Sequence, residues 1–314
     1  MKLSVGPILY LWERSTVLSF YESLCDAPVD IVYLGEVVCS KRRFMRKEDW
    51  LAVTEMLRSA GKEVVISTLA LIEAESELAS LARIAQNTDV LVEANDYACI
   101  ECLDGRPFVA GPHLNVYNEA TLRLIARHGA RRWVAPVELP LAIVAALAEL
   151  RPPKLEVEMF SYGRLPLAFS ARCFTARAQR RAKDDCQFVC AAHPDGSTVY
   201  SRDGQPFLAL NGIQTQSAAT QNLLPHVRKL RNAGVDVLRL SPQSRDFAAV
   251  VNAFRAALDG NDDVTLPASF LPGGYCDGYL DGAAGLEIVE NEQRMPHPAP
   301  VRPAAPAASL SRAR

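Results

Sequence analysis

Eight short apolar runs, each followed by a helical pattern, constrain the fold of this chain more than any other feature. The runs are rich in Val, Ile and Leu and almost continuously apolar, as expected of strands that are buried on both faces. They lie at residues 6–10, 30–35, 63–68, 89–94, 107–112, 131–139, 155–162 and 235–242. This alternation predicts an α/β fold, a TIM-barrel-like (β/α)8 barrel. A doubly wound open sheet is an alternative that periodicity leaves open.

The helical segments between these runs carry recognisable end signals. The pattern over 46–62 closes at Gly61, a residue suited to a left-handed helix cap. The segment 118–130 begins at Asn118, a good N-cap, and ends at Gly129. Since no GxGxxG follows the first strand and no GxxxxGK[ST] occurs, dinucleotide-binding and P-loop functions lose support.

The chain is expected to form a single barrel-like domain over 1–290, with an insertion after the seventh strand at about 163–221. The insertion contains a predicted hairpin with its turn at Asp203-Gly204, and a helix is expected to begin near Asn222. The Pro/Ala-rich tail at 291–314 is expected to be disordered.

Composition limits the class of protein. At 314 residues, 49% hydrophobic and a net charge of −2, the chain reads as soluble and globular, without the basic excess of a general nucleic-acid coat. No signal peptide is evident, and the longest apolar run is too short for a transmembrane segment. The expected location is therefore cytoplasmic. In that reducing compartment the eight cysteines favour metal ligands, reactive thiols or packing over disulfides.

Four of these cysteines are the candidate metal ligands. Cys173, Cys186 and Cys190 lie in a basic segment of the insertion, and Cys39 follows the second strand at the same barrel rim. The four-residue spacing of Cys186 and Cys190 suits one face of a helical turn. Four thiolates at one rim could bind zinc or an iron–sulfur cluster, and the spacing does not choose between them. The other four cysteines, Cys25, Cys99, Cys102 and Cys276, are expected to pack in the core despite the CxxC pattern of the middle pair.

The strand ends carry a second set of candidate residues, because barrel chemistry sits at the carboxyl ends of the strands. They predict a polar cavity at this rim, and are Glu36, Ser67, Thr68, Glu93, Asn95, Asp96, His113, Asn115, Glu138, Ser161, Tyr162, Arg239 and Ser241. Basic neighbours of the cysteines, Arg42 and Arg172 among them, favour thiolates or could receive an anionic substrate. No HExxH or GxSxG motif supports ordinary hydrolytic chemistry.

A family resemblance rests on "YLGEVVCSKRR", "STLAL", "VEAND", "PVELP", "SYGRLPLAFSARCFTAR", "NGIQT" and "VLRLSP". The chain resembles the collagenase-like, U-type peptidase family over nearly all residues up to about 290. Many relatives carry a cysteine where Pro166 stands here, so a four-thiolate site needs another sulfur. The resemblance implies that Cys39, Cys173, Cys186 and Cys190 bind a [4Fe-4S] cluster.

The resemblance also implies a function and partners. The most similar members act in oxygen-independent ring hydroxylation of ubiquinone precursors, with prephenate as the suggested oxygen donor. They work as heterodimers with a homologous UbiU-like partner, and a UbiT-like lipid-binding accessory protein presents the apolar intermediates. A U-type peptidase-family hydrolase, an RNA hydroxylase and a non-catalytic metal-containing scaffold are the alternatives; the slight negative charge disfavours nucleic acid.

Overall fold

Eight parallel strands close into a barrel in the computed structural model, whose described residues are 1–86, 89–267, 271 and 273–289. The barrel strands are β1 (Lys2–Val5), β2 (Ile31–Leu34), β3 (Glu63–Ser67), β4 (Leu91–Ala94), β5 (Phe108–Ala110), β6 (Ala130–Val134), β7 (Glu156–Phe169) and β11 (Val237–Leu240). β11 pairs with both β1 and β7, which closes the sheet. The predicted (β/α)8 architecture is confirmed, and the open-sheet alternative is wrong.

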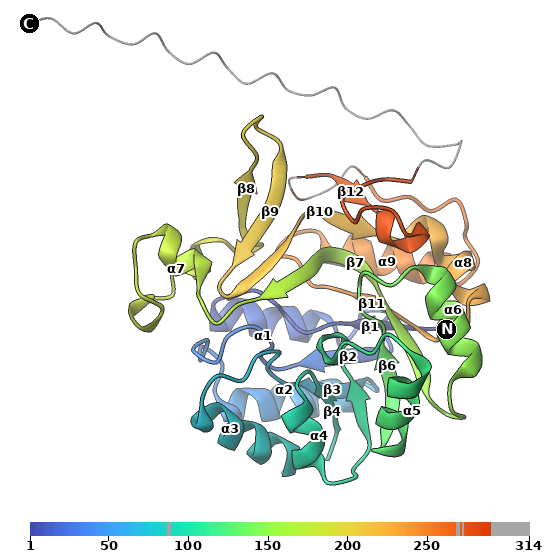
Figure 1. The fold of residues 1–314 in the computed structure, drawn as a ribbon, viewed down its shortest axis with the longest axis horizontal. Helices are drawn as coiled ribbons and strands as arrows, with labels where there is room; N and C mark the ends of the chain where they lie inside the picture. The colour runs from blue at the N-terminus through green and yellow to red at the C-terminus, as the bar shows by residue number, and fades with distance from the viewer. Residues whose placement is uncertain (87–88, 268–270, 272, 290–314) are drawn as a thin grey trace, which may run out of the picture.

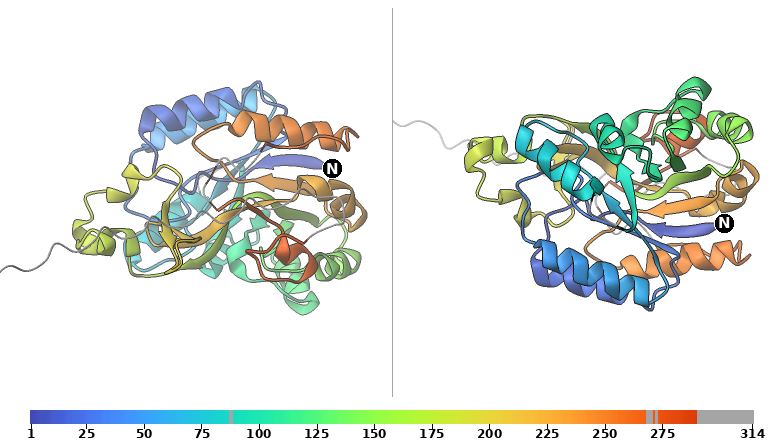
Figure 2. Two further views of the ribbon diagram at one scale, coloured as in Figure 1. Left: turned by 90° about the horizontal axis from the view of Figure 1, so that it is seen from above. Right: turned by 90° about the horizontal axis from the view of Figure 1, so that it is seen from below.

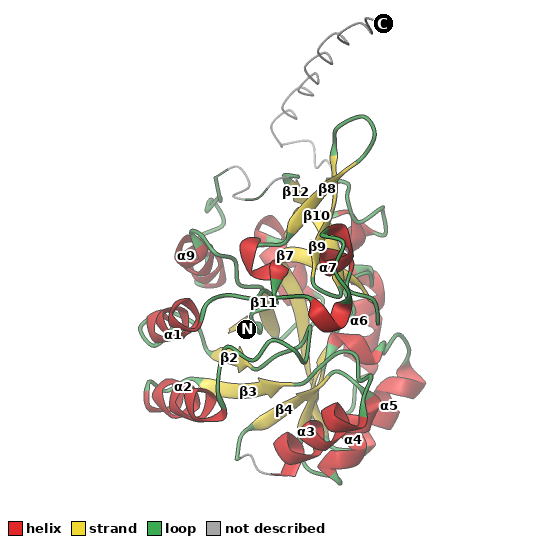
Figure 3. Ribbon diagram, turned by 90° about the vertical axis from the view of Figure 1, so that its left-hand side faces the viewer, coloured by secondary structure: helices red, strands yellow, loops and turns green. Residues whose placement is uncertain are grey.

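Helices cover the outside of this barrel (Figure 3). Those that connect or follow barrel strands are α1 (Arg14–Ser23), α2 (Lys47–Ser59), α3 (Glu75–Gln86), α4 (Tyr97–Leu103), α5 (Glu119–Arg127), α6 (Leu141–Leu150), α8 (Val227–Asn232) and α9 (Phe247–Leu258). The predicted caps are present: Asn118 Oδ1 accepts from Thr121 N at 2.9 Å, and Gly61 and Gly129 have positive φ. No helix in the described residues is long and apolar enough to cross a bilayer.

Beyond the barrel, β7 continues into a mainly antiparallel extension of the same sheet. β10 (Gln214–Asn222) pairs with β7, β9 (Pro206–Asn211) with β10, and β8 (Ser197–Tyr200) with β9, while β12 (Tyr275–Cys276) lies beside β10. The β8–β9 hairpin, predicted around Asp203-Gly204, projects from the molecule (Figure 1). The predicted insertion boundaries, 163 and 221, thus fall inside β7 and near the end of β10.

The remaining short elements lie mostly in connections. They are α7 (Phe174–Ala178) and the 3-10 helices η1 (Pro112–Leu114), η2 (Lys183–Asp185), η3 (Val189–Ala192), η4 (Leu224–His226) and η5 (Gly278–Asp281). Figure 2 shows β1 running from the N terminus toward the side on which α7 and its neighbouring loops lie. The cysteine segment is therefore at the carboxyl end of the barrel strands.

The core has two parts, because barrel strands are buried on both faces. The larger cluster joins the outward-facing strand residues, such as Val32 and Val64, to the inner faces of the helices. A smaller apolar layer lies inside the barrel and contains Ile31, Val65, Val109, Val134 and Val237. Apolar burial on both faces explains why the strands read as continuous apolar runs.

Three local predictions are wrong. The first strand is Lys2–Val5 rather than 6–10: Gly6 N still donates to Leu240 O at 2.8 Å, but Pro7 has no N–H with which to continue a ladder. Residues leading to Asn222 form the strand β10, and the following α-helix begins at Val227. Cys186 and Cys190 do not share a helical turn, because Gln187 and Phe188 between them have positive φ. The predicted tail at 291–314 lies outside the described residues.

Candidate functional site

Cys39 and Cys173 come from distant parts of the sequence and meet at one apolar cluster. Cys39 follows β2, and Cys173 is the N-cap of α7, where its Sγ accepts from Ala176 N at 3.4 Å. Both thiols are half-buried, and both pack against the cluster that contains Leu9, Val38 and Ile213. The barrel thus brings the predicted fourth cysteine to the inserted segment.

Cys186 is the C-cap of η2 and Cys190 lies in η3, and this segment is attached to the loop that carries Cys39. Lys41 Nζ donates to Lys183 O at 3.2 Å and to Asp184 Oδ1 at 2.6 Å. The rings of Phe44 and Phe188 are 5.4 Å apart between centroids. These contacts hold the segment around Cys186 and Cys190 beside the Cys39 loop.

The thiols also influence one another electrostatically. Burial raises the pKa of Cys39; Arg42 lowers it, and the charge of Cys173 raises it further. Burial likewise raises the pKa of Cys190, with Arg42 opposing and Cys173 and Cys186 adding to the rise. All four predicted cysteines therefore belong to one electrostatic neighbourhood. The basic neighbour does favour the thiolate form, as expected, but desolvation outweighs it.

Arg42 is a structural part of this neighbourhood rather than a free cation at the rim. Its side chain is buried, and it donates to Leu9 O and to Asn211 Oδ1, both at 2.7 Å. Gly212, at φ +65°, leaves room for the guanidinium, since a Cβ there would lie 2.8 Å from Arg42 Nη2. The segments "CSKRR" and "NGIQT" therefore meet at Arg42. Arg172, the other basic residue singled out, is exposed.

The other four cysteines are buried or half-buried, as predicted for cysteines that pack in the core. Cys99 on α4 is fully buried in the main core, where burial raises its pKa to about 12. Cys276 is buried in β12, and its pKa is also raised to about 12 by burial. Cys25 and Cys102 are half-buried against the main core. In the described residues, no group of three or more His, Cys, Asp or Glu side chains is placed to hold a metal ion.

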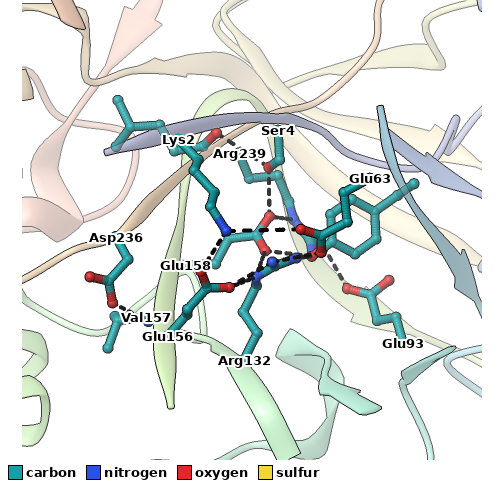
Figure 4. Close-up of polar contacts among 12 residues, drawn as sticks. Lys2, Ser4, Glu63, Glu93, Arg132, Glu156, Val157, Glu158, Asp236 and Arg239 are labelled. Atoms are coloured by element: carbon teal, nitrogen blue, oxygen red, sulfur yellow. Dashed lines mark hydrogen bonds and ion pairs between the residues drawn. The ribbon is translucent and has the colours of Figure 1, made fainter. Parts of the chain in front are cut away.

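Ion pairs fill much of the barrel interior (Figure 4). Glu158 is fully buried; it accepts from Arg239 Nε at 2.8 Å, from Ser4 Oγ at 2.6 Å and from the Tyr33 hydroxyl. Arg132 donates to Tyr33 Oη at 3.1 Å and pairs with Glu63 and Glu156. Burial raises the pKa of Glu158, but Arg239 and Arg132 outweigh it and leave the pKa lowered. The carboxylate therefore stays charged.

The upper end of this network reaches the predicted polar set at the strand ends. Glu93 accepts from Ser67 Oγ at 2.6 Å, and its Oε1 lies 2.7 Å from Arg239 Nη1. Glu93 Oε1, Asn95 Oδ1 and Arg239 Nη2 are buried without hydrogen-bond partners among the described residues. Buried polar atoms of this kind mark a place where a polar ligand or water would bind.

His113 lies within electrostatic reach of Arg239 at this end. His113 is half-buried. The surrounding protein nevertheless desolvates its ring and lowers the pKa to about 4, and the charge of Arg239 lowers it further. Its ring is 4.7 Å from that of Phe169, edge to face. The imidazole is therefore neutral at neutral pH and can donate or accept a hydrogen bond without carrying charge.

Other strand-end candidates have structural tasks. Asp96 caps α4 by accepting from Ala98 N at 2.8 Å, and Glu138 accepts a hydrogen bond from Tyr117. Glu36 accepts from Val38 N and Cys39 N at 2.9 and 3.0 Å, which shapes the Cys39 loop. Asn115 is the left-handed cap of η1. These four residues therefore position loops rather than line the barrel mouth.

The remaining strand-end candidates are buried. Thr68 Oγ1 donates to Glu93 O at 2.8 Å, and Ser161 Oγ donates to Met159 O at 2.9 Å. Tyr162 donates to Gln243 Oε1 at 3.0 Å. Ser241 N bonds Tyr162 O at 2.8 Å. Backbone and neighbouring side chains thus engage these groups.

A buried His226–Asp277 pair is the arrangement that most resembles part of a hydrolytic triad. The two side chains are 3.0 Å apart and both are buried. The neighbouring thiol, Cys276, has a pKa raised by burial and by Asp277, opposite to what an activated nucleophile needs. Since Asp277 Oδ1 also accepts from Val289 N at 2.8 Å, the pair fastens the C-terminal segment to the start of α8.

The family model described as "Peptidase family U32" matches residues 18–267, which is most of the chain. The chain belongs to the peptidase U32 family.

The chain is similar to a number of solved structures, among them the following two. The U32 peptidase Mk0906 is 13% identical, with a TM-score of 0.45, over 77% of this chain and 93% of that one. A phospho-2-dehydro-3-deoxyheptonate aldolase of Thermotoga maritima is 12% identical, with a TM-score of 0.36, over 82% of this chain and 68% of that one.

Proposed function

We propose that this U32-family chain is a [4Fe-4S] subunit of the UbiV type, required for oxygen-independent ring hydroxylation in ubiquinone biosynthesis. It would act in the cytoplasm as a heterodimer with a UbiU-like partner. A UbiT-like protein would deliver the ubiquinone precursors, and prephenate is the proposed oxygen donor. Cys39, Cys173, Cys186 and Cys190 are the proposed ligands.

The observation that carries this proposal is the gathering of four cysteines from two segments at the carboxyl end of the barrel. Cys39 and Cys173 pack against one apolar cluster. Besides burial, the charges of Cys173 and Cys186 both raise the pKa of Cys190. Thiolate sulfur is the ligand that iron–sulfur clusters use. The donor set therefore suits the proposed group in ligand chemistry and in its side of the barrel, although the described side chains do not form a ready-made metal site, so ligation requires the thiols to draw together.

The protein would contribute surroundings and substrate contacts. A bound cluster supplies one-electron chemistry and carries net negative charge with four thiolates, which the buried guanidinium of Arg42 opposes. At the barrel mouth, Arg239 Nη2 has a free donor position that suits a carboxylate of the oxygen donor. Neutral His113 near Arg239 could hold or pass a proton at one ring nitrogen.

Ubiquinone content tests the proposal in cells that lack the gene. Without oxygen, we expect the intact gene to restore ubiquinone and the Cys39→Ala and Cys190→Ala variants to fail, while Cys102→Ala, the matched control, restores it. With oxygen, all should make ubiquinone, because the requirement concerns the oxygen-independent route. Full restoration by a variant that lacks all four proposed ligands would contradict the proposal.

A further inference from the structure

A large groove opens on the outer wall of the barrel, between α2 and α3. α2 packs against α1 and α3 packs against α4, and the space between the two pairs has a volume of about 1050 Å³. Figure 3 shows both helices on the outside of the strands. One end of the groove adjoins the carboxyl ends of β2 and β3. It is lined there by Glu36, Ser67 and Thr68, together with Ser40 and Arg43 from the loop that carries Cys39.

The floor and walls of this groove are apolar. Leu34 and Ile66 point outward from β2 and β3, and Ile66 is only half-buried although its outward neighbour Val64 is in the core. From the helices, Leu51 is 57% exposed and Ile84 is 36% exposed. An unburied aliphatic side chain in the middle of a barrel wall indicates a surface that gains free energy when covered.

Positive charge without a counter-ion lies at the end nearest Cys39. Arg43 and Lys47 are exposed, and neither has an acidic partner among the described residues. The carboxylates at this end have other cationic neighbours, and Glu36 lies 3.7 Å from Arg42. Burial raises the pKa of Glu77, but its hydrogen bonds, one of them from Ser40, and the charge of Lys183 leave the pKa lowered. At the opposite end Arg58 shares the lining with Glu55 and Asp89, so the charges there are mixed.

We infer that this groove binds a single-chain amphiphile with an acidic head group. The head lies at Arg43 and Lys47, and the apolar chain runs over Leu34 and Ile66 between the two helices. The volume is at the upper end of the range of small-molecule pockets, roughly 300–1,000 Å³. The lining of α2 from Lys47 to Arg58 covers roughly 16 Å at about 1.5 Å per residue, enough for an extended hydrocarbon chain.

This inference goes beyond the proposed function and does not require the cluster. A helix of another protein is the competing occupant, but uncompensated charge at one end of an apolar groove is complementary to an amphiphile with one charged end. The two occupants differ in a test on the purified full-length chain, since a lipid-like ligand binds with no other protein present.

The first test is titration of the purified protein with cis-parinarate, a fatty acid that fluoresces in apolar surroundings. We expect saturable binding with one site, competed by palmitate. Ile84→Asp, on a partly exposed position, should weaken binding about tenfold or more because it places a charge in the groove. Leu124→Asp, on an exposed position of α5, is the control and should bind as wild type does.

The second test concerns the head group. The double variant Arg43→Ala and Lys47→Ala should weaken palmitate binding and leave that of the uncharged hexadecanol unchanged. Arg58→Ala, at the other end of the groove, should affect neither. Absence of saturable binding, or equal binding by the Ile84→Asp and Leu124→Asp variants, would overturn the inference. Iron content is measured independently of ligand binding. A result that overturns ligand binding in the groove can therefore be told apart from one that overturns cluster binding.

Discussion

At the scale of single residues, the barrel interior depends on charges that satisfy one another. Glu158 accepts from Arg239, Ser4 and Tyr33, and Arg239 lies 4.1 Å above the Tyr33 ring. A buried charge is tolerated when it is paired and hydrogen-bonded. Removing one member therefore leaves the others charged in a medium of low polarity.

Glu158→Ala should lower the free energy of unfolding by about 3–5 kcal/mol, because it leaves two buried guanidinium groups with fewer partners. Urea denaturation measures this. Glu119→Ala, which breaks the exposed pair with Arg123 on α5, is the matched control and should change stability by less than about 0.5 kcal/mol. Equal effects of the two substitutions would contradict a structural role of the network.

His113 predicts a pH dependence of stability. Its folded pKa of about 4 lies below the unfolded value of about 6.5, so the folded state resists protonation. Stability from this residue is fully present above pH 6.5 and falls as the pH drops toward 4, because the unfolded chain takes up the proton first. His113→Phe should remove this dependence. NMR titration should find a neutral ring at pH 6; a charged ring there would refute the assignment.

The positions of the strand ends in the sequence predict part of the site. Glu93, Asn95, His113 and Arg239 are predictable in this way, because polar residues at the ends of apolar runs gather at one end of a parallel barrel. Tyr33, Arg132 and Glu158 are not predictable in this way, because they lie within their strands and not at the carboxyl ends. The signal was present in "LEVEMF", where Glu156 and Glu158 alternate with apolar residues, but alternation normally indicates a solvated face.

At the scale of elements, the extension of β7 organises the carboxyl end of the barrel. β7 pairs with β11 inside the barrel and then with β10 outside it. The change of partner occurs around Gly163, at φ +130°, where a Cβ would lie 2.5 Å from Ser241 Cβ. Only glycine lets the two strands approach this closely.

Gly163→Ala should therefore destabilise the protein by more than about 2 kcal/mol, through steric overlap and an unfavourable backbone angle. Gly204→Ala in the β8–β9 turn is the control: its φ is +80° but nothing lies within 4 Å of an added Cβ, so a cost of about 1 kcal/mol is expected. Thermal unfolding measures both. A smaller cost at 163 than at 204 would count against this account.

Elements with apolar periodicity were predictable, whereas polar strands were not. β2 to β5 lie within the predicted runs, and β6 begins one residue before its predicted run, at Ala130. β10, "QTQSAATQN", is almost wholly buried yet polar, and among the described residues the Gln216 amide and Thr220 Oγ1 have no hydrogen-bond partner. No apolar pattern marks such a strand, and its pairing with β7 is set by contacts far apart in the sequence.

At the scale of the whole molecule, the barrel acts as a frame that brings the cysteine segment to the loop after β2. Lys41 and Phe44 from that loop contact the η2–η3 region. Arg42 donates to Leu9 in the β1–α1 loop and to Asn211 at the end of β9. The sequence predicts which end of the barrel the thiols share. It does not predict the contacts that hold them there, since these join segments with no common periodicity.

Metal analysis of the protein purified without oxygen tests the central claim most directly. Iron, acid-labile sulfide and zinc are measured in the wild type and in Cys39→Ala, Cys173→Ala, Cys186→Ala and Cys190→Ala, with Cys102→Ala as control. We predict about four irons and four sulfides per chain in wild type and control, and loss of both in each ligand variant. Stoichiometric zinc, or iron unchanged in the four variants, would contradict the account.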